Sequence, residues 1–332
     1  MADKEMTMRE ALNLALDHAL QTDDRVFLLG EDIADPGASG PTAGLSTKYG
    51  HDRVLDTPIS EAAIVGAAIG AAIDGMLPVA EIMIMDFIGI AADQLINNAA
   101  KLRFMTAGRT TAPITVRTQV YAGLATGATH SQSLEAWFMH IPGMKVIVPS
   151  TPRDGKGLLT SAIFDPDPCL FVETVRLQSK KGLVPVDPGF AIPLGQADIK
   201  RPGADVSLIS YGRAVHDALA AAETLADQGV SAEVVDLRTL VPLDVETVVE
   251  SVRRTRRAVI VHDAVQFAGP GAEVAAILQA ELFGELVAPV ERVGARFVPN
   301  PAAAALEAQV YPSPARVVAA AQRTLAKAGA RG

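Results

Sequence analysis

The strongest constraint on the fold is a regular alternation of short apolar runs with stretches in which apolar residues recur at helical spacing. The runs in the first half of the chain lie at residues 26–30, 79–85, 114–118, 145–148 and 169–173. Strands that alternate with helices in this way are typical of a parallel sheet covered by helices. The pattern therefore predicts an α/β fold.

The alternation is interrupted once, by a segment rich in Pro, Gly and Lys at about residues 179–193. Beyond it, strands are predicted at 206–210, 233–237 and 258–262, separated by amphipathic helices. A chain of 332 residues is long enough for two domains. We therefore predict two α/β domains, 1–190 and 191–332, of which the second is smaller.

Local signals give the expected starts of two helices. Thr7 and Glu10 have the spacing of a capping box, which predicts a helix that precedes the first strand. Thr57 suits an N-cap and Pro58 a first helical position, which predicts a second helix that runs through Ile73. Other expected elements are a helix at 93–104 and loops at 35–46 and 121–133.

Composition excludes several classes of protein. Lys and Arg number 29 against 38 Asp and Glu, a net charge of −9, which argues against nucleic-acid binding. The longest apolar stretch, residues 62–73, is shorter than the roughly 20 residues that span a bilayer. The single cysteine, Cys169, excludes an intramolecular disulfide and suits a reducing compartment. No secretory or transit signal is evident at residues 1–8, so we expect a cytoplasmic protein without a membrane partner.

Common catalytic motifs are missing from the sequence. The chain contains no phosphate-binding G-x-x-x-x-G-K-[ST] loop, no H-E-x-x-H zinc motif and no G-x-S-x-G nucleophile elbow. These absences leave most common classes of enzyme unsupported.

An acidic residue, Glu61, stands one turn before a strongly apolar helical face. Gly66 and Gly70 are four residues apart, which predicts close approach of another helix to that face. A carboxylate against an apolar surface loses solvation, which suits it to share a proton with a nitrogen heterocycle. Because an acidic residue in a first helical turn also compensates the helix dipole, the position alone leaves both roles open.

Several strings of residues resemble one family of enzymes. The spacing Glu61, Gly66, Gly70 is similar to a pattern shared by thiamin diphosphate enzymes. The string Asp56-Thr57-Pro58-Ile59-Ser60-Glu61 resembles the β subunit of the decarboxylase component of 2-oxo acid dehydrogenase complexes, of the pyruvate or acetoin type. Further matches lie at 127–132, 140–152, 156–159 and 237–244, so the resemblance covers nearly the whole chain. It implies a pyrimidine-binding domain followed by a transketolase C-terminal-like domain.

The resemblance also implies roles for individual residues. Glu61 matches the carboxylate that hydrogen-bonds the N1′ atom of the aminopyrimidine, and Phe87 matches an aromatic residue that packs against the same ring. His130 matches a residue that assists proton and acyl transfer. Without the resemblance, Phe87 would be interpreted as core and His130 as structural. Some members hold a potassium ion with backbone carbonyls, and the matching positions are Ile114, Ala162, Asp165 and Asp167.

One expected part of a thiamin site is missing. The chain has no G-D-G turn, which in thiamin enzymes helps to hold the magnesium ion that binds the diphosphate. The resemblance implies that an α subunit supplies these ligands in an α2β2 heterotetramer. The implied reaction is oxidative: a hydroxyethyl-type carbanion forms on thiamin diphosphate, and the acyl group passes to the lipoyl domain of an acyltransferase.

The sequence leaves the substrate open among pyruvate, acetoin and a branched-chain 2-oxo acid. The string at 81–90 is most similar to acetoin dehydrogenases, but pyruvate and acetoin yield the same acetyl product. One alternative is the C-terminal half of a split transketolase. Ser131 argues against it, because the similar transketolase motif has no residue between the positions of His130 and Gln132. The other is a non-catalytic docking subunit, against which the intact Glu61, Phe87 and His130 argue.

Overall fold

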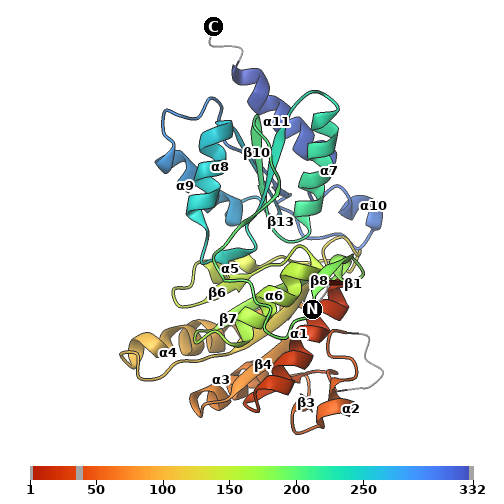
Figure 1. Cartoon of the computed structure of the whole chain (residues 1–332), viewed down its shortest axis with the longest axis vertical. Coiled ribbons are helices and arrows are strands. Elements are labelled where there is room, and N and C mark those ends of the chain that lie inside the picture. Colours follow the sequence, from red (N-terminus) through yellow and green to blue (C-terminus); the bar gives the residue numbers. More distant parts are fainter. Residues whose placement is uncertain (1–2, 35–39, 329–332) are drawn as a thin grey trace. The chain divides into compact units, whose positions relative to one another are not determined.

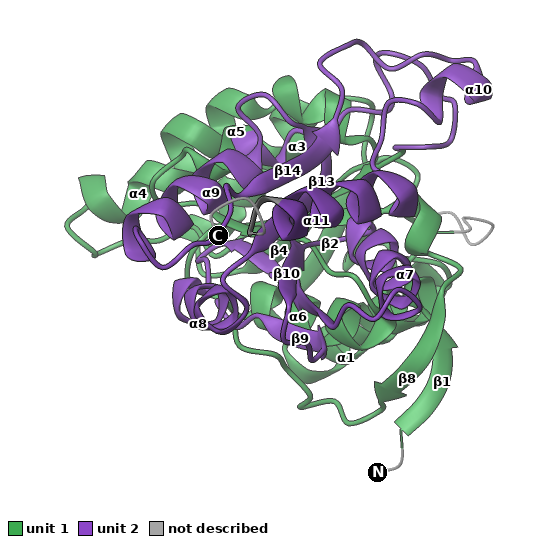
Figure 2. Cartoon of the chain, turned by 90° about the horizontal axis from the view of Figure 1, so that it is seen from above, with its two compact units in different colours: residues 1–121, 137–194 green, residues 122–136, 195–332 purple. Residues whose placement is uncertain are grey.

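The computed structural model describes residues 3–34 and 40–328. The chain divides into two compact units, which Figure 2 colours separately. Unit 1 contains residues 1–121 and 137–194, and unit 2 contains residues 122–136 and 195–332. A short segment from the middle of the chain thus belongs to the second unit. The domain boundary near residue 190 remains a prediction.

Unit 1 contains a parallel sheet whose strands follow the order β6-β7-β5-β4-β2-β3. Every residue of β4, β5 and β7 is buried, as expected for a parallel sheet covered on both faces. The strands are β2 (Val26–Gly30), β3 (Val54–Asp56), β4 (Leu77–Ile82), β5 (Thr115–Val120), β6 (Lys145–Ile147) and β7 (Cys169–Thr174). The predicted α/β fold is confirmed for this unit.

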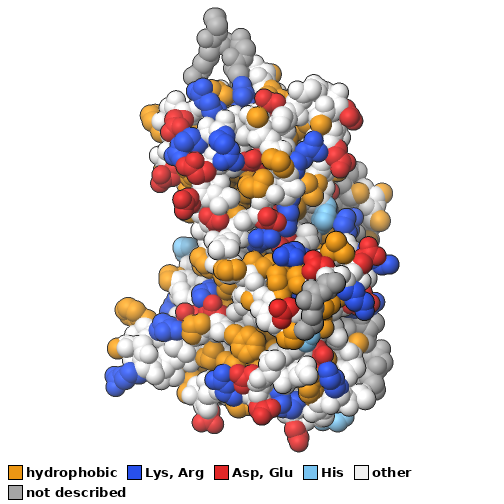
Figure 3. Space-filling view, viewed as in Figure 1, with side chains coloured by type: hydrophobic (Ala, Val, Ile, Leu, Met, Phe, Trp, Pro, Cys, Tyr) orange, Lys and Arg blue, Asp and Glu red, His pale blue; other side chains and the backbone are white. Residues whose placement is uncertain are grey.

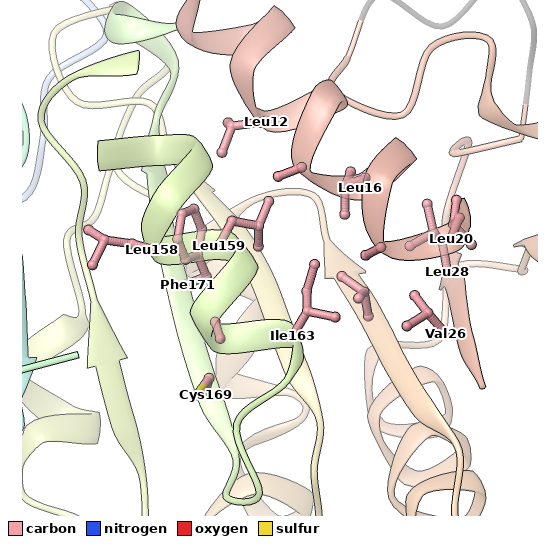
Figure 4. Packing of buried hydrophobic residues seen from close by; sticks show 14 of the residues in the cluster. Leu12, Leu16, Leu20, Val26, Leu28, Leu158, Leu159, Ile163, Cys169 and Phe171 are labelled. Atoms are coloured by element: carbon pink, nitrogen blue, oxygen red, sulfur yellow. The ribbon is translucent and has the colours of Figure 1, made fainter. Parts of the chain in front are cut away.

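Two helices pack together over this sheet. Helix α1 (Met8–Thr22) begins at the predicted capping box, in which the Thr7 hydroxyl accepts the Glu10 N–H at 3.2 Å. It packs against α6 (Pro152–Ile163). Leucines at i, i+4 and i+8 of α1 point into the core between the two helices and the sheet, as Figure 4 shows for Leu12, Leu16 and Leu20.

The helix predicted from Pro58 to Ile73 begins three residues later than expected. Helix α3 is Glu61–Ile73, with Ser60 as its N-cap residue. The Thr57 N–H donates to the carbonyl of Gly30 at 2.9 Å, so the chain before Ser60 is held to the end of β2 instead of turning into the helix. Glu61 is therefore the first residue of α3.

The glycines of α3 behave differently from the prediction. A Cβ atom on Gly66 would meet the Gln94 side chain of the same chain at 3.5 Å, whereas one on Gly70 would meet nothing within 4 Å. Gln94 begins a π-helical turn, η2 (Gln94–Ala99), that continues into α4 (Ala100–Met105), where one regular helix was predicted at 93–104. Within the described chain, close approach of another element occurs at Gly66 and not at Gly70.

The segment predicted as an irregular linker at 179–193 contains a strand. Strand β8 (Lys181–Pro185) pairs antiparallel with β1 (Asp3–Thr7), from Asp3 opposite Pro185 to Thr7 opposite Lys181. Each strand has only one buried residue, and both lack the apolar alternation by which strands are recognised, so the prediction missed them.

Unit 2 is a second α/β unit, built on a sheet of order β14-β13-β10-β11-β9 in which only β9 is antiparallel to its neighbour. Helices α7 and α11 cover one face and α8 and α9 the other (Figure 1). The strands are β9 (Asp198–Arg201), β10 (Val206–Ser210), β11 (Ala232–Asp236), β13 (Ala258–Val265) and β14 (Glu291–Ala295). The helices are α7 (Ala214–Ala226), α8 (Val245–Thr255), α9 (Pro270–Glu281) and α11 (Pro314–Ala328).

Several short elements complete the structure. They are α2 (Leu45–Tyr49), η1 (Met85–Gly89), α5 (Glu135–Met139), η3 (Val175–Leu177), β12 (Thr239–Val241) and α10 (Ala304–Glu307). Of the loop predicted at 35–46, residues 35–39 lie outside the described residues, and α2 begins at Leu45. The loop predicted at 121–133 contains neither helix nor strand.

The surface agrees with the charge balance of the sequence. On the face drawn in Figure 3, acidic and basic side chains are intermingled over both units. In the part of the chain that the structure describes, no helix is long and apolar enough to cross a membrane.

Candidate active site

A cavity of about 240 Å³ in unit 1 brings together two of the predicted site residues, Glu61 and Phe87. It lies beyond the carboxyl ends of β2 and β4, where open α/β sheets commonly bind ligands. Its lining is mixed, with three carboxylates among apolar side chains. The lining residues are Glu31, Ile59, Glu61, Ile64, Glu81, Ile82, Met83, Ile84 and Phe87.

Glu61 is placed in the cavity by the connection between β3 and α3. It is 7% exposed although it is the first residue of a helix. The carboxylate of Asp56, at the end of β3, accepts the N–H of Ala34 at 2.7 Å, and Thr57 is bonded to Gly30. These contacts hold the chain that precedes Glu61, which lines the cavity with little exposure to water, close to the carboxylate of Glu31.

Phe87 reaches the cavity from the short helix η1. Met85 and Ile88 of that helix are fully buried and anchor it, while Phe87 is half-buried. The predicted strand at 79–85 ends earlier, at Ile82, and the chain then turns into η1. This turn is what brings the aromatic ring to the same cavity as Glu61.

Two further carboxylates of the cavity, Glu31 and Glu81, were missed by the sequence analysis. Glu31 directly follows β2, and burial raises its pKa, helped by the nearby negative charges of Asp32 and Glu61. Glu81 lies inside β4 and is 8% exposed. The sequence did contain a signal for Glu81, which is a charged residue in an otherwise apolar strand. Charged residues are rarely buried unless they are paired, so a partner for Glu81 could have been expected.

Glu81 belongs to a buried ion-pair network behind the cavity. Arg117, opposite Glu81 on β5, donates to Glu81 at 2.6 Å and to Glu173 of β7 at 2.7 Å. Arg117 is 1% exposed and Glu173 2%. Burial raises the pKa of Glu173 to about 7, although Arg117 acts in the opposite direction. One guanidinium therefore holds two carboxyl groups, of which only Glu81 lines the cavity.

His130 lies in unit 2, in the segment 122–136. Its Nδ1 atom is 3.1 Å from the hydroxyl of Thr129, and the ring is partly exposed. The structure therefore brings Glu61 and Phe87 together, and places His130 in the other unit. Its predicted role remains a prediction.

A second cavity, of about 320 Å³, lies in unit 2 beside the His130 segment. It is lined by residues of that segment, among them Ser131 and Gln132, and by residues after β14, among them Phe297 and Asn300. His130 itself is not among the lining residues.

Three of the four carbonyls expected to hold potassium accept a hydrogen bond within the chain, which leaves each of them a second lone pair. The Ile114 carbonyl accepts the N–H of Cys169 at 2.9 Å, and the Ala162 carbonyl accepts that of Asp165 at 3.2 Å. The side chain of Asp165 is paired with Lys145 at 2.6 Å, and the carbonyl of Asp167 is 3.5 Å from the thiol of Cys169. Within residues 3–34 and 40–328, no group of three or more His, Cys, Asp or Glu side chains is arranged to hold a metal ion.

Family models match both halves of the chain. Residues 4–179 match the pyrimidine binding domain of transketolase, and residues 195–317 match the transketolase C-terminal domain. A 46% identical relative, from Cupriavidus necator, is the β subunit of acetoin:2,6-dichlorophenolindophenol oxidoreductase, and the match covers 97% of this chain and 98% of the relative. The chain belongs to the family of acetoin and pyruvate dehydrogenase β subunits.

Other members of the family are nearly as similar. The β-2 subunit of the mitochondrial pyruvate dehydrogenase E1 component from Oryza sativa is 44% identical, with 98% of this chain and 88% of the relative covered. The β subunit of 2-oxoisovalerate dehydrogenase from Bacillus subtilis is 43% identical, over 95% of this chain and 97% of the relative. The family resemblance found in the sequence is thus confirmed.

A solved structure supports the fold. The chain aligns with a split-gene transketolase, described as an inactive β4 tetramer, at a TM-score of 0.78 over 97% of this chain and 98% of that one. The identity is 24%, so this match concerns the fold alone. It confirms the predicted order of a pyrimidine-binding domain followed by a transketolase C-terminal-like domain.

Proposed function

We propose that this chain is the β subunit of a thiamin diphosphate-dependent dehydrogenase that acts on pyruvate or acetoin. The observation that carries the proposal is the cavity shared by Glu61 and Phe87 in a member of this family. Identities of 46% and 44% to acetoin and pyruvate enzymes do not choose between the two substrates.

The residues of the cavity fit the aminopyrimidine ring of thiamin diphosphate. A flat heteroaromatic ring needs apolar walls for its faces and a hydrogen-bonding group for its nitrogens. Phe87 and Ile84 supply apolar surface, and the buried carboxylate of Glu61 supplies the polar group. When bound, the cofactor supplies a carbon nucleophile for addition to the substrate carbonyl. Glu61 would hold a proton at the ring nitrogen, and Phe87 would hold the plane of the ring.

The proposal includes partners for this chain. We place the magnesium ligands on an α subunit, in an α2β2 heterotetramer, and the acyl acceptor on the lipoyl domain of an acyltransferase. His130 would assist acyl transfer, and the backbone carbonyls of Ile114, Ala162, Asp165 and Asp167 would be the potassium ligands. The names of the relatives, which are β subunits, support the α partner.

The proposed function is tested by turnover in the assembled complex. The chain is co-expressed with a candidate α subunit, and reduction of 2,6-dichlorophenolindophenol is followed with pyruvate and with acetoin. We expect turnover of at least one substrate, dependent on both subunits, with the α subunit alone as the control. Turnover of a ketose phosphate instead would favour the split transketolase, and a complex inactive on all three and on 2-oxoisovalerate would favour a docking subunit.

Dependence on the α subunit gives a separate prediction for the chain alone. Because its described residues contain no cluster of metal ligands, titration with thiamin diphosphate and magnesium in a calorimeter is expected to show negligible binding. The co-purified complex should bind the cofactor stoichiometrically. Tight, magnesium-dependent binding to the chain alone would contradict the proposed division of the site between subunits.

A further inference from the structure

The segment that carries His130 is held by residues far along the chain. Residues 122–136 belong to unit 2, although the residues on both sides of them belong to unit 1. At Gly123, Ala125 and Ser131, the hydrogen bonds to the rest of unit 2 are made with partners 169–184 positions later in the sequence, and at Glu135 the partner is Tyr211. The part of the segment from Gly123 to Ser131 is therefore attached to the region between β14 and α11.

Glu307 makes the first of these attachments. Its Oε1 atom accepts the N–H of Gly123 at 3.1 Å, and its Oε2 atom accepts the N–H of Ala125 at 2.6 Å. The side chain is 2% exposed. The backbone of Glu307 is bonded as well, because its N–H donates to Ala303 and its carbonyl accepts from Val310. A buried carboxylate that accepts two backbone N–H groups makes strong, charge-assisted hydrogen bonds.

The backbone that Glu307 holds is in a disfavoured conformation. Gly123 and Gly127 have φ values of +82° and +88°, and Ala125, between them, has a φ of +56°. Left-handed backbone is disfavoured for alanine because its Cβ approaches the carbonyl oxygen. Such a conformation persists only where the surroundings impose it, and the Glu307 carboxylate is the group bonded to this stretch.

A second attachment lies directly after His130. The carbonyl of Ser131 accepts hydrogen bonds from the Asn300 side chain at 3.0 Å and from the Tyr311 hydroxyl at 2.9 Å. Between the two attachments, the Thr126 hydroxyl donates to the carbonyl of His130 at 3.0 Å. His130 is thus bracketed by Glu307 on its N-terminal side and by Tyr311 and Asn300 on its C-terminal side.

We infer that Glu307 is a positioning residue for His130. Its carboxylate holds the left-handed backbone at 123–127, and Tyr311 holds the chain at Ser131, so that the imidazole is presented in one orientation. The inference rests on the proposed function, in which His130 assists acyl transfer. It adds to that function a residue of the C-terminal unit that acts through the His130 segment and not by contact with substrate.

The decisive variant is Glu307→Gln. The glutamine amide keeps the size of the side chain, but its NH2 group would face one of the two backbone N–H groups. We expect the rate of acyl transfer to a purified lipoyl domain to fall about 10- to 100-fold, because small misplacement of a catalytic group has effects of this size. Dichlorophenolindophenol reduction by the assembled complex should stay within about twofold. Glu281→Gln, an exposed change at the end of α9, is the matched control and should leave both rates unchanged.

A double-variant cycle separates positioning from general destabilisation. If Glu307 acts through His130, Glu307→Gln should have no further effect on the lipoyl rate when His130→Ala is already present. Effects that multiply in the double variant would overturn the inference. An unchanged lipoyl rate in His130→Ala would overturn the role of His130 and the inference with it. A rate lost in His130→Ala but retained in Glu307→Gln would overturn the role of Glu307 alone.

A second variant keeps the test independent of folding. Tyr311→Phe removes one hydroxyl donor to Ser131 and keeps the buried ring. It should lower the lipoyl rate in the same selective manner as Glu307→Gln, at an unfolding midpoint close to that of the unchanged complex. Equal loss of lipoyl and dichlorophenolindophenol rates in both variants would overturn the inference.

Discussion

Replacement of Glu61 by glutamine is expected to lower turnover by the assembled complex roughly 10²- to 10⁴-fold, the usual contribution of a group that transfers a proton in catalysis. The amide has nearly the same size as the carboxylate and fills the same cavity, but it cannot take up or release the proton. Assembly with the α subunit should be unaffected, because the change alters only one side chain of a preformed cavity. Steady-state dichlorophenolindophenol reduction and size-exclusion chromatography measure the two quantities.

A matched control for this variant exists in the second unit. Glu273 also lies in the first turn of a helix, α9, but it is exposed. Glu273→Gln removes the same helix-dipole compensation, worth about 0.3–1 kcal/mol, without touching the cavity. Normal turnover is expected for it. If Glu61→Gln retained near-normal turnover as well, Glu61 would have no part in catalysis, and compensation of the helix dipole would be its whole role.

Replacement of Arg117 by methionine is expected to have the largest effect on stability. Removal of one partner from a buried ion pair costs about 3–5 kcal/mol, because the remaining charge has neither solvent nor counter-charge. Here two carboxyl groups, those of Glu81 and Glu173, would lose the same guanidinium. The thermal midpoint of the assembled complex should fall by roughly 10 °C. Arg253→Met on α8 removes an exposed partner of Glu250 and is expected to cost less than about 1 kcal/mol.

The Arg117 network also predicts a dependence of stability on pH. Burial raises the pKa of Glu173 to about 7, above its ordinary value of 4.5. The folded protein therefore retains a proton that the unfolded chain has lost, and the contribution of Glu173 to stability is fully present below pH 4.5. It is lost as the pH rises through 7. Glu173→Gln should flatten the fall of the unfolding midpoint between pH 5.5 and 8, and an unchanged slope would show that another group is responsible.

Much of the fold could be predicted from the sequence because most of its strands carry a local signal. The strand Val206–Ser210 is apolar enough to be recognised without its neighbours, and the capping box at Thr7 fixes the start of α1. The ribbon of β1 and β8 could not be predicted, because each strand buries only one residue and pairs with a strand far away in the sequence. The start of α3 was wrong for a related reason: the bond from Thr57 to Gly30 is a long-range contact.

The residues of the candidate site also fall into two groups, those with a local signal in the sequence and those without one. Glu61 and Phe87 stand in motifs, so a family resemblance identified them, and the structure adds that they line one cavity. Glu31 stands in no such motif and has the appearance of an ordinary loop residue. The attachment of Glu307 to Ala125 spans 182 residues and leaves no local pattern in the sequence at all. Only the fold brings these groups to their partners.

The contact between Ala125 and Glu307 has a consequence for biosynthesis. During translation at about 5–20 residues per second, the segment around His130 is synthesised roughly 10–40 s before Glu307. In that interval the left-handed backbone at Ala125 has no carboxylate to hold it, although the strands β2 to β5 of unit 1 have already been synthesised. The loop proposed to serve acyl transfer therefore gains this contact only after residue 307 has been made, long after the synthesis of every residue that lines the cavity of Glu61 and Phe87.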